Sequence, residues 1–302
     1  MIKQLLVFFL LIFFIPSIST AQTFRGTETM GYLVDGMNDI RFKDTQLAFS
    51  LWTKEIALNE NMNIIVKFFE NDKDIIKSFI NLDIRYIAMN PIFYLQNYST
   101  LDPLAKQYWV SQKTDKMYAK MVLLTRKDSG IKNLSDLKNK KITTGKGNYL
   151  GELFLDKEIL QELHISSSKH YKELVYTKRY STAILKTFFG KSDACIVPEY
   201  TLQLVGEMNP AVASALVPIA QSENIFISNI ALFHSTTEDW MMETFNKNAA
   251  DLSQSVRGQS ILDLFKMKKI RMIEKKKLEP LKKYYKEYLD LKKKYGVNND
   301  SK

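Results

Sequence analysis

Residues 141–160, KITTGKGNYLGELFLDKEIL, contain a β-strand, a glycine-rich turn and an α-helix in that order. Residues 141–144 are rich in β-branched side chains and predict the strand. Gly145-Lys146-Gly147-Asn148 forms the turn. The apolar side chains after it recur at helical spacing and predict a helix over residues 149–163. A strand that leads through a tight turn into a helix is the basic unit of an α/β fold.

The same alternation continues on both sides of this stretch. Short runs rich in Ile, Val and Phe predict further strands, and the segments between them show helical spacing. The predicted strands are 30–34, 63–69, 84–89, 117–125, 175–177, 194–197 and 225–233. The pattern predicts an α/β protein with mostly parallel central sheets flanked by helices.

The N-terminus has the pattern of an export signal. Leu5–Ile15 is an unbroken apolar run, shorter than the roughly 20 residues that span a bilayer. Ser19-Thr20-Ala21 fits the small-residue rule for signal peptidase and predicts cleavage before Gln22. We therefore expect residues 1–21 to be a signal peptide and the mature protein to be soluble and periplasmic. An uncleaved anchor is the alternative.

The positive charge is concentrated near the C-terminus. The formal net charge is +10, and residues 268–294 contain twelve Lys or Arg against four acidic residues. The rest of the chain is close to neutral, which argues against a nucleic-acid groove. Leucines and tyrosines recur at helical spacing between these lysines. They predict an amphipathic helix that packs on the body with a solvated basic face, or alternatively a helix that leans on anionic lipid.

The sequence shows no assembled catalytic, metal or cofactor site. Cys195 is the only cysteine and lies in an apolar run, so we expect a buried core residue and no disulfide. None of the three histidines has a metal-ligand partner at helical spacing, and no nucleophile elbow or H-E-x-x-H motif occurs. The pattern Gly145-x-Gly147-x-x-x-Gly151 is one residue too long for a dinucleotide fingerprint. We expect no catalysis, metal or cofactor.

Three predicted helices begin directly after strands, and they predict an anion site. They begin at Asn90-Pro91, Gly147-Asn148-Tyr149 and Tyr180-Ser181-Thr182. Helix N-termini expose backbone N–H groups and attract anions. In an open α/β sheet, ligands bind at the carboxyl ends of the strands. Lys146 and Arg179 lie beside two of these helix starts. The alternative is that Asn90 and Ser181 only cap their helices.

The segment D-S-G-I-x-x-L-x-D-L-K-x-K-K at residues 128–141 resembles the phosphate/phosphite/phosphonate-binding family of ABC-transporter solute receptors. Residues 83–91 and 192–199, with 207–210 after them, are similar to further segments of that family, and the likeness covers most of residues 28–234. The resemblance implies a type II periplasmic-binding-protein fold, in which two α/β lobes are joined by two crossing strands. Residues 117–125 and 225–233 would be the crossings, and ligand would lie in the cleft that hinge closure shuts.

The resemblance divides the chain into a signal peptide and two lobes. We expect lobe 1 to comprise residues 22–120 and 229–302, including the basic C-terminal helix, and lobe 2 to comprise residues 121–228. The family's S-T-S-G-like run is replaced here by residues 147–151, its glycine before Pro91 by Asn90, and its histidine at the third helix start by Tyr180. These departures reduce the number of hydroxyl donors for a phosphonate.

The resemblance and the helix starts together predict a solute-binding protein that carries a phosphonate-like or phosphate-like anion, or a zwitterion, to the permease of an ABC transporter. The expected oxyanion contacts are Asn90, Gly147, Asn148, Tyr149, Tyr180, Ser181 and Thr182. Lys146 or Arg179 would add positive charge, and Tyr94 would pack on an apolar part of the ligand. Glu199 and Asp35 would meet a cationic group, or would be solvated acids at the cleft edge.

Two other functions remain open from the sequence. The same fold can present its closed form to a histidine kinase or another membrane partner, or it can be a periplasmic enzyme, for which no catalytic dyad is evident. We expect a monomer that binds no nucleic acid.

Overall fold

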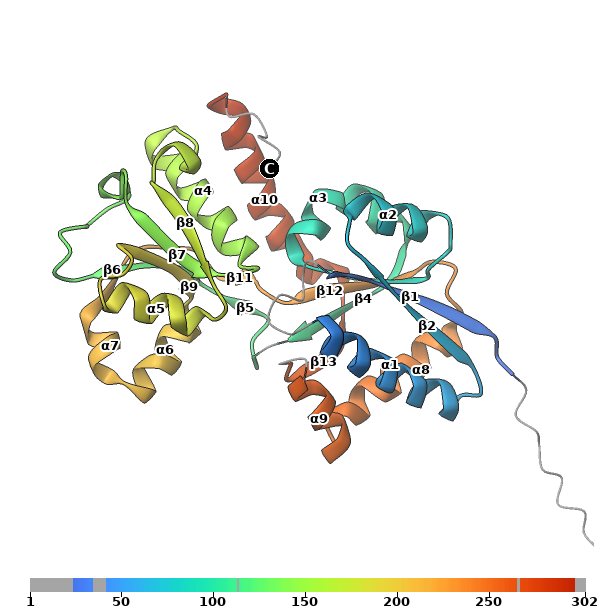
Figure 1. The fold of residues 1–302 in the computed structure, drawn as a ribbon. Coiled ribbons are helices and arrows are strands. Elements are labelled where there is room, and N and C mark those ends of the chain that lie inside the picture. Colours follow the sequence, from blue (N-terminus) through green and yellow to red (C-terminus); the bar gives the residue numbers. More distant parts are fainter. Residues whose placement is uncertain (1–23, 35–41, 113, 265–266, 297–302) are drawn as a thin grey trace, which may run out of the picture.

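The computed structural model describes residues 24–34, 42–112, 114–264 and 267–296. The predicted signal peptide and Asp35 lie outside these residues. Figure 1 shows two lobes, each with its own sheet and flanking helices, joined by a narrow middle region. Among the described residues, no helix combines the length and the apolar character needed to cross a membrane.

Lobe 1 contains a six-stranded sheet in the order β13-β4-β12-β3-β1-β2. Its strands are β1 (Thr27–Leu33), β2 (Asn63–Phe69), β3 (Tyr86–Met89), β4 (Ala105–Gln112), β12 (Asn229–His234) and β13 (Lys269–Ile273). Helices cover both faces of this sheet and form two groups (Figure 1). The first group is α2 (Asp72–Ile80) and α3 (Pro91–Leu101), and the second is α1 (Phe42–Asn59), α8 (Asp239–Leu252) and α9 (Val256–Leu264).

Lobe 2 contains a five-stranded sheet in the order β10-β6-β9-β7-β8. Its strands are β6 (Met121–Arg126), β7 (Lys141–Gly145), β8 (Glu173–Thr177), β9 (Ala194–Pro198) and β10 (Leu216–Gln221). Its helices are α4 (Tyr149–Leu163), α5 (Tyr180–Phe188), α6 (Glu199–Met208) and α7 (Pro210–Ala215). Cys195 on β9 is fully buried, as predicted, and burial raises the pKa of its thiol to about 12.

Two very short strands connect the lobes. The chain leaves lobe 1 after β4, passes through β5 (Tyr118–Ala119) and enters β6. It returns from β10 through β11 (Ile225–Phe226) to β12, and β5 pairs with β11 in an antiparallel two-stranded sheet. The two predicted crossing segments are therefore each divided into a hinge strand of two residues and a longer strand that belongs to a lobe.

Both sheets are mixed. Parallel pairing joins β2, β1 and β3 in lobe 1, and β8, β7 and β9 in lobe 2. Every other pair in these two sheets is antiparallel. The antiparallel strands include those that the chain enters directly after a hinge crossing, β6 and β12. The prediction of an α/β fold is confirmed, but the expectation of mostly parallel sheets is wrong, because periodicity along one strand does not report its direction relative to a partner.

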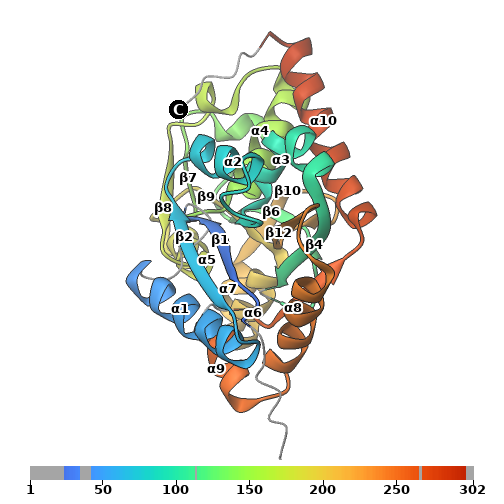
Figure 2. The same ribbon diagram turned by 90° about the vertical axis from the view of Figure 1, so that its right-hand side faces the viewer.

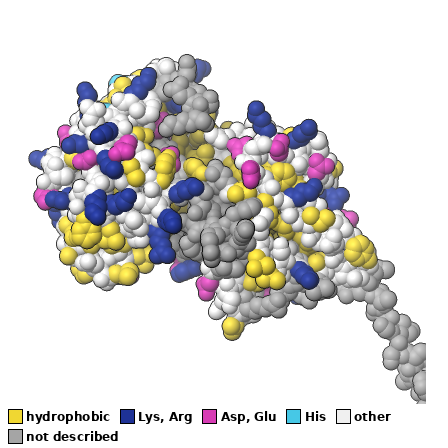
Figure 3. Space-filling view, viewed as in Figure 1, with side chains coloured by type: hydrophobic (Ala, Val, Ile, Leu, Met, Phe, Trp, Pro, Cys, Tyr) yellow, Lys and Arg dark blue, Asp and Glu magenta, His cyan; other side chains and the backbone are white. Residues whose placement is uncertain are grey.

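The basic C-terminal segment forms the 3₁₀ turn η5 (Lys275–Leu278) and the helix α10 (Glu279–Lys294). Leu278, Leu281 and Tyr284 are buried, whereas Lys283 and Lys286 are exposed. The prediction of an amphipathic helix that packs on the body is confirmed. Figures 1 and 2 show α10 lying beside α4 and α3. Figure 3 shows that Lys and Arg side chains on the visible face are spread over both lobes.

Candidate functional site

A pocket lies where the two lobes and the hinge meet. Its volume is about 60 Å3, which is room for a few water molecules or a small oxyanion. Lobe 1 contributes Asn90 and Pro91 at the start of α3. The crossings contribute Met121, Ile227 and Asn229. Lobe 2 contributes Gly147, Asn148, Tyr149, Leu150, Tyr180, Pro198 and Tyr200.

Asn90 lines the pocket on the side of lobe 1. Its Oδ1 accepts a hydrogen bond from the backbone N–H of Phe93 at 2.8 Å, and Pro91 occupies the first helical position. This is a standard N-cap, in which the side chain satisfies one of the orphan donors of the helix. The cap contact predicted as the alternative is therefore present, and the same residue also lines the pocket.

Asn148 lines the pocket on the side of lobe 2. Its Oδ1 accepts from the backbone N–H of Gly151 at 3.3 Å and so caps α4. Its Nδ2 donates to Thr144 Oγ1 at 2.9 Å and to the carbonyl oxygen of Ile196 at 3.4 Å. The side chain is buried and tied to both β7 and β9. Because of these bonds, Asn148 has a single orientation at the pocket wall.

The two glycines of the turn, Gly145 and Gly147, and Gly151 in the first turn of α4 each make room for a pocket residue or shape the loop. A Cβ on Gly145 would lie 2.6 Å from the ring of Tyr180, and a Cβ on Gly151 would collide with the side chain of Asn148. Gly147 has φ +79°, which favours glycine. The G-x-G-x-x-x-G spacing that resembled a dinucleotide motif thus reflects the close approach of Tyr180 and Asn148.

Three tyrosines line the pocket from the starts of three successive helices of lobe 2. Tyr149 begins α4, Tyr180 begins α5, and Tyr200 is the second residue of α6. Sequence reasoning did not single out Tyr200, although its helix also begins directly after a strand. Asn229 and the other crossing residues were also missed, because their position at the pocket depends on the long-range pairing of β12 with β3 and β4.

Several predicted site residues lie apart from the pocket lining. Lys146, Arg179 and Thr182 are exposed, and Ser181 is half-buried, one residue after Tyr180. Arg179, rather than Ser181, is the N-cap residue of α5. Glu199 is half-buried beside Tyr200.

Tyr94 does not line the pocket. It lies one helical turn after Asn90, is fully buried, and donates its hydroxyl proton to Asp102 at 2.8 Å. α3 packs against α10, and Lys282 Nζ of α10 lies 5.9 Å from the ring centroid of Tyr94. The structure brings together five predicted residues: Asn90, Gly147, Asn148, Tyr149 and Tyr180.

The pocket lining combines polar and apolar residues and carries no charged side chain. None of the described lining residues has an ionisable carboxylate, ammonium or guanidinium group. Within the described part of the chain, no cluster of His, Cys, Asp or Glu is arranged to hold a metal ion. The chemistry available at the pocket is hydrogen bonding by amides and phenols together with the partial positive charge of helix N-termini.

Two α/β lobes joined by two strands, with a pocket between them, define the class of periplasmic binding proteins. The family model described as ABC transporter, phosphonate, periplasmic substrate-binding protein matches residues 59–278. The chain belongs to this family, whose members are binding proteins and not enzymes. No curated protein matches the sequence.

Solved structures with the same fold have little sequence identity to the chain. A binding-protein component of an ABC phosphonate transporter from Pseudomonas aeruginosa has a TM-score of 0.60 and 10% identity, with 91% of each chain covered. PhnD1 from Prochlorococcus marinus, in complex with methylphosphonate, has a TM-score of 0.57 and 16% identity, with 90% of this chain and 99% of that chain covered. The periplasmic aliphatic sulphonate binding protein SsuA from Escherichia coli has a TM-score of 0.50 and 14% identity, with 90% and 88% covered.

Proposed function

We propose that this protein captures a small anionic or zwitterionic ligand, of the phosphonate or phosphate type, in the interlobe pocket and delivers it to the permease of an ABC transporter. The observation that carries the proposal is the meeting of four helix starts at one pocket. The starts of α3, α4, α5 and α6 contribute Asn90, Tyr149, Tyr180 and Tyr200 respectively.

Helix starts suit an oxyanion for two reasons. The first backbone N–H groups of a helix have no intrahelical acceptor, and the helix dipole places partial positive charge at the same end. Asn90 comes from lobe 1 and the three tyrosines from lobe 2, so a bound anion would contact both lobes. A ligand that contacts both lobes favours the closed arrangement over the open one.

The pocket size limits the ligand. A volume of about 60 Å3 fits a tetrahedral oxyanion with a short substituent. PhnD1, a relative in fold, was solved with methylphosphonate, which has this size and shape. The exposed Lys146 and Arg179 would increase the local concentration of anions at the pocket entrance. Glu199, one residue before Tyr200, would meet an amino group if the ligand is a zwitterion.

A thermal-shift panel tests the proposal. It contains inorganic phosphate, phosphite, methylphosphonate, 2-aminoethylphosphonate, methanesulfonate and several amino acids. A ligand that binds only the folded protein raises the unfolding midpoint by mass action. We expect a concentration-dependent rise with at least one phosphorus oxyanion and none with neutral amino acids. A panel without any shift, confirmed by calorimetric titration, would contradict the proposal.

Two glycine variants locate the binding. In Gly145→Ala the new Cβ displaces the ring of Tyr180, so the midpoint shift should disappear. The matched control is Gly206→Ala, whose Cβ would lie 2.9 Å from Ala213 between α6 and α7, away from the pocket lining. Both variants overpack lobe 2, but only the first one alters the pocket. Equal ligand shifts in the two variants would assign binding to another place.

A further inference from the structure

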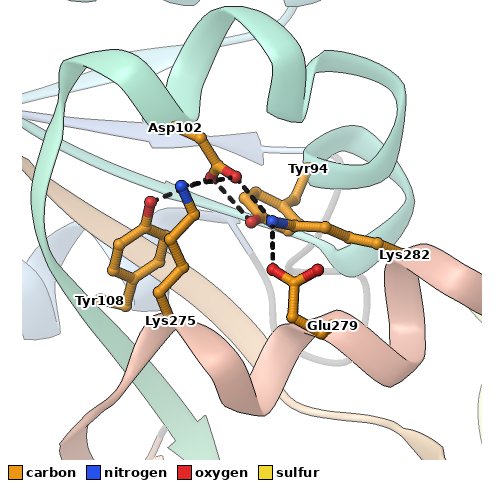
Figure 4. A network of polar contacts seen from close by, with 6 residues as sticks. All are labelled: Tyr94, Asp102, Tyr108, Lys275, Glu279 and Lys282. Carbon is orange, nitrogen blue, oxygen red and sulfur yellow. Dashed lines mark hydrogen bonds and ion pairs between the residues drawn. The ribbon is translucent and has the colours of Figure 1, made fainter.

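The N-terminal end of α10 is fixed to lobe 1 by a buried polar network (Figure 4). Lys282 Nζ donates to Asp102 Oδ2 at 2.6 Å and to Glu279 Oε1 at 2.9 Å. Tyr94 and Tyr108 donate their hydroxyl protons to the other oxygen of Asp102, at 2.8 and 3.0 Å. The side chains of Lys282 and Asp102 are each only 10% exposed.

The network favours the ionised form of the Asp102 carboxyl, whose pKa is lowered. Burial raises the pKa, but the hydrogen bonds from Lys282, Tyr94 and Tyr108 outweigh burial and lower it below its ordinary value. Lys275 of η5 adds an ion pair to the same carboxylate at 3.2 Å. The start of the C-terminal segment therefore belongs structurally to lobe 1.

The C-terminal half of the same helix is fixed to lobe 2. Tyr288 donates its hydroxyl proton to Asp156 Oδ2 of α4 at 2.7 Å. Lys157, also of α4, pairs with Glu287 at 2.8 Å, and its Nζ lies 3.8 Å from the ring centroid of Tyr284. The Lys157 side chain is only 9% exposed, whereas the Glu287 side chain is 44% exposed, so the ion pair is half-buried at the edge of the contact.

Further contacts extend the attachment along α10. The rings of His164, at the end of α4, and Tyr295 stack with centroids 4.2 Å apart. Between its two ends, α10 packs on the hinge strand β11. Leu281 and Leu278 belong to one apolar cluster that includes Leu95 of lobe 1, Phe154 of lobe 2 and Phe226 of β11. The two lobes therefore share a continuous core beneath α10.

We propose that α10 is a third connection between the lobes, and that Asp156, Lys157, Glu287 and Tyr288 are positioning residues for ligand binding. They hold the lobes in the arrangement in which Asn90 faces the tyrosines of lobe 2, and none of them lines the pocket. Rotation of the lobes about two hinge strands of two residues each separates α10 from one lobe. Of the two contacts of α10, the one with α4 in lobe 2 separates first. The contact with lobe 1 is the stronger one, because the buried carboxylate of Asp102 is paired there more completely.

The consequence is a change in apparent affinity without a change at the pocket. When the binding-competent arrangement is only a fraction of the population, the apparent affinity falls by that fraction. Removal of the two polar contacts between α10 and α4 should weaken binding roughly tenfold, the value of a single charge-assisted hydrogen bond, because both contacts are only part-buried. This inference rests on the proposed function for its effect on binding, but its effect on the lobe arrangement does not require a ligand.

The test measures the distance between the lobes in the ligand-free protein. Spin labels are attached at Glu70→Cys in lobe 1 and Lys172→Cys in lobe 2, both exposed positions, and the native Cys195 is fully buried. Double electron–electron resonance then compares the labelled parent with Lys157→Met/Tyr288→Phe. We expect the variant distribution to move or broaden. Tyr288→Phe alone, which removes one hydroxyl group, should show a smaller change in the same direction.

The matched control is Tyr176→Phe. The Tyr176 hydroxyl donates to Glu152 of α4 at 3.0 Å, so this variant also removes a tyrosine–carboxylate bond to α4, but both partners belong to lobe 2. Its distance distribution should equal that of the parent. Identical distributions in the folded parent, the double variant and Tyr288→Phe would overturn the inference.

A methylphosphonate titration of the same proteins separates the two proposals. Weaker binding by the double variant, with Tyr176→Phe unchanged, supports both of them. A parent that does not bind methylphosphonate counts against the proposed ligand class, while the distance measurement still decides the role of α10. Unchanged affinity together with an altered distance distribution would overturn the assignment of these four residues as positioning residues.

Discussion

The two lobes meet in two places that differ in chemistry. At the pocket, uncharged residues of both lobes, such as Asn90 and Tyr180, line a hollow of about 60 Å3. Under α10, the lobes are joined by packed leucines and by part-buried ion pairs such as that of Lys157 with Glu287. One contact leaves space between the lobes, and the other fills it.

This difference indicates separate roles for the two contacts. A hollow gains contacts when a ligand enters, so substitutions of the residues that line it should change ligand binding more than folding. A packed contact with paired charges contributes in the absence of ligand, so substitutions there should change stability and lobe arrangement first. The following predictions test this separation.

The largest expected effect is on stability, from Lys282→Met. The variant leaves Asp102 buried without its main counter-charge, and removal of one partner of a buried pair costs about 3 kcal/mol. Urea unfolding of the ligand-free protein measures the loss. Lys106→Met is the control, since Lys106 pairs with Asp239 at an exposed position and such pairs contribute under about 1 kcal/mol. Equal losses would show that the network at Asp102 contributes no more than a surface pair.

The second prediction concerns the sign of the stability change in Gly151→Ala, a substitution inside α4 behind the pocket lining. Alanine in place of glycine inside a helix normally stabilises by about 1 kcal/mol. Gly151→Ala should instead destabilise, because the new Cβ displaces the side chain of Asn148, which then loses its cap and its bond to Thr144. Thermal unfolding gives the sign. A stabilised Gly151→Ala protein would show that Asn148 is not held by this contact.

The smallest expected effect is a pH dependence of the contact between α10 and α4. The hydrogen bond from Lys157 lowers the pKa of Glu287 below its ordinary value of 4.5. For a carboxyl with a lowered pKa, the stabilisation is complete above pH 4.5 and is lost as the pH falls through the folded-state value. The interlobe distance distribution should therefore change only below pH 4.5. In Lys157→Met this acid-induced change should be reduced, and an equally large change there would contradict the role of the pair.

Local patterns were sufficient to predict the features that depend on neighbours in sequence. The helix starts at Asn90-Pro91 and Asn148-Tyr149 follow from capping chemistry and proline at the first turn, and the structure contains both of them. The buried Cys195 and the amphipathic α10 likewise follow from apolar spacing.

Features that depend on long-range packing were not predictable in the same way. Tyr94 was expected at the ligand, but α3 turns it toward Asp102 and Lys282, which lie 8 and 188 positions further along the chain. Tyr200 and Asn229 reach the pocket through the pairing of β9 and β12 with their neighbours. The connection between the lobes through α10 depends on residues of both lobes. It could not be predicted from helical periodicity, which indicates only which face of the helix is apolar.

A crystal structure with the oxyanion that gives the largest thermal shift tests the central claim most directly. We expect density for the anion between the starts of α3 and α4, in contact with residues of both lobes, and α10 in contact with both Asp102 and Asp156. Density for the anion on the outer surface of a single lobe, with the interlobe pocket filled only by water, would contradict it.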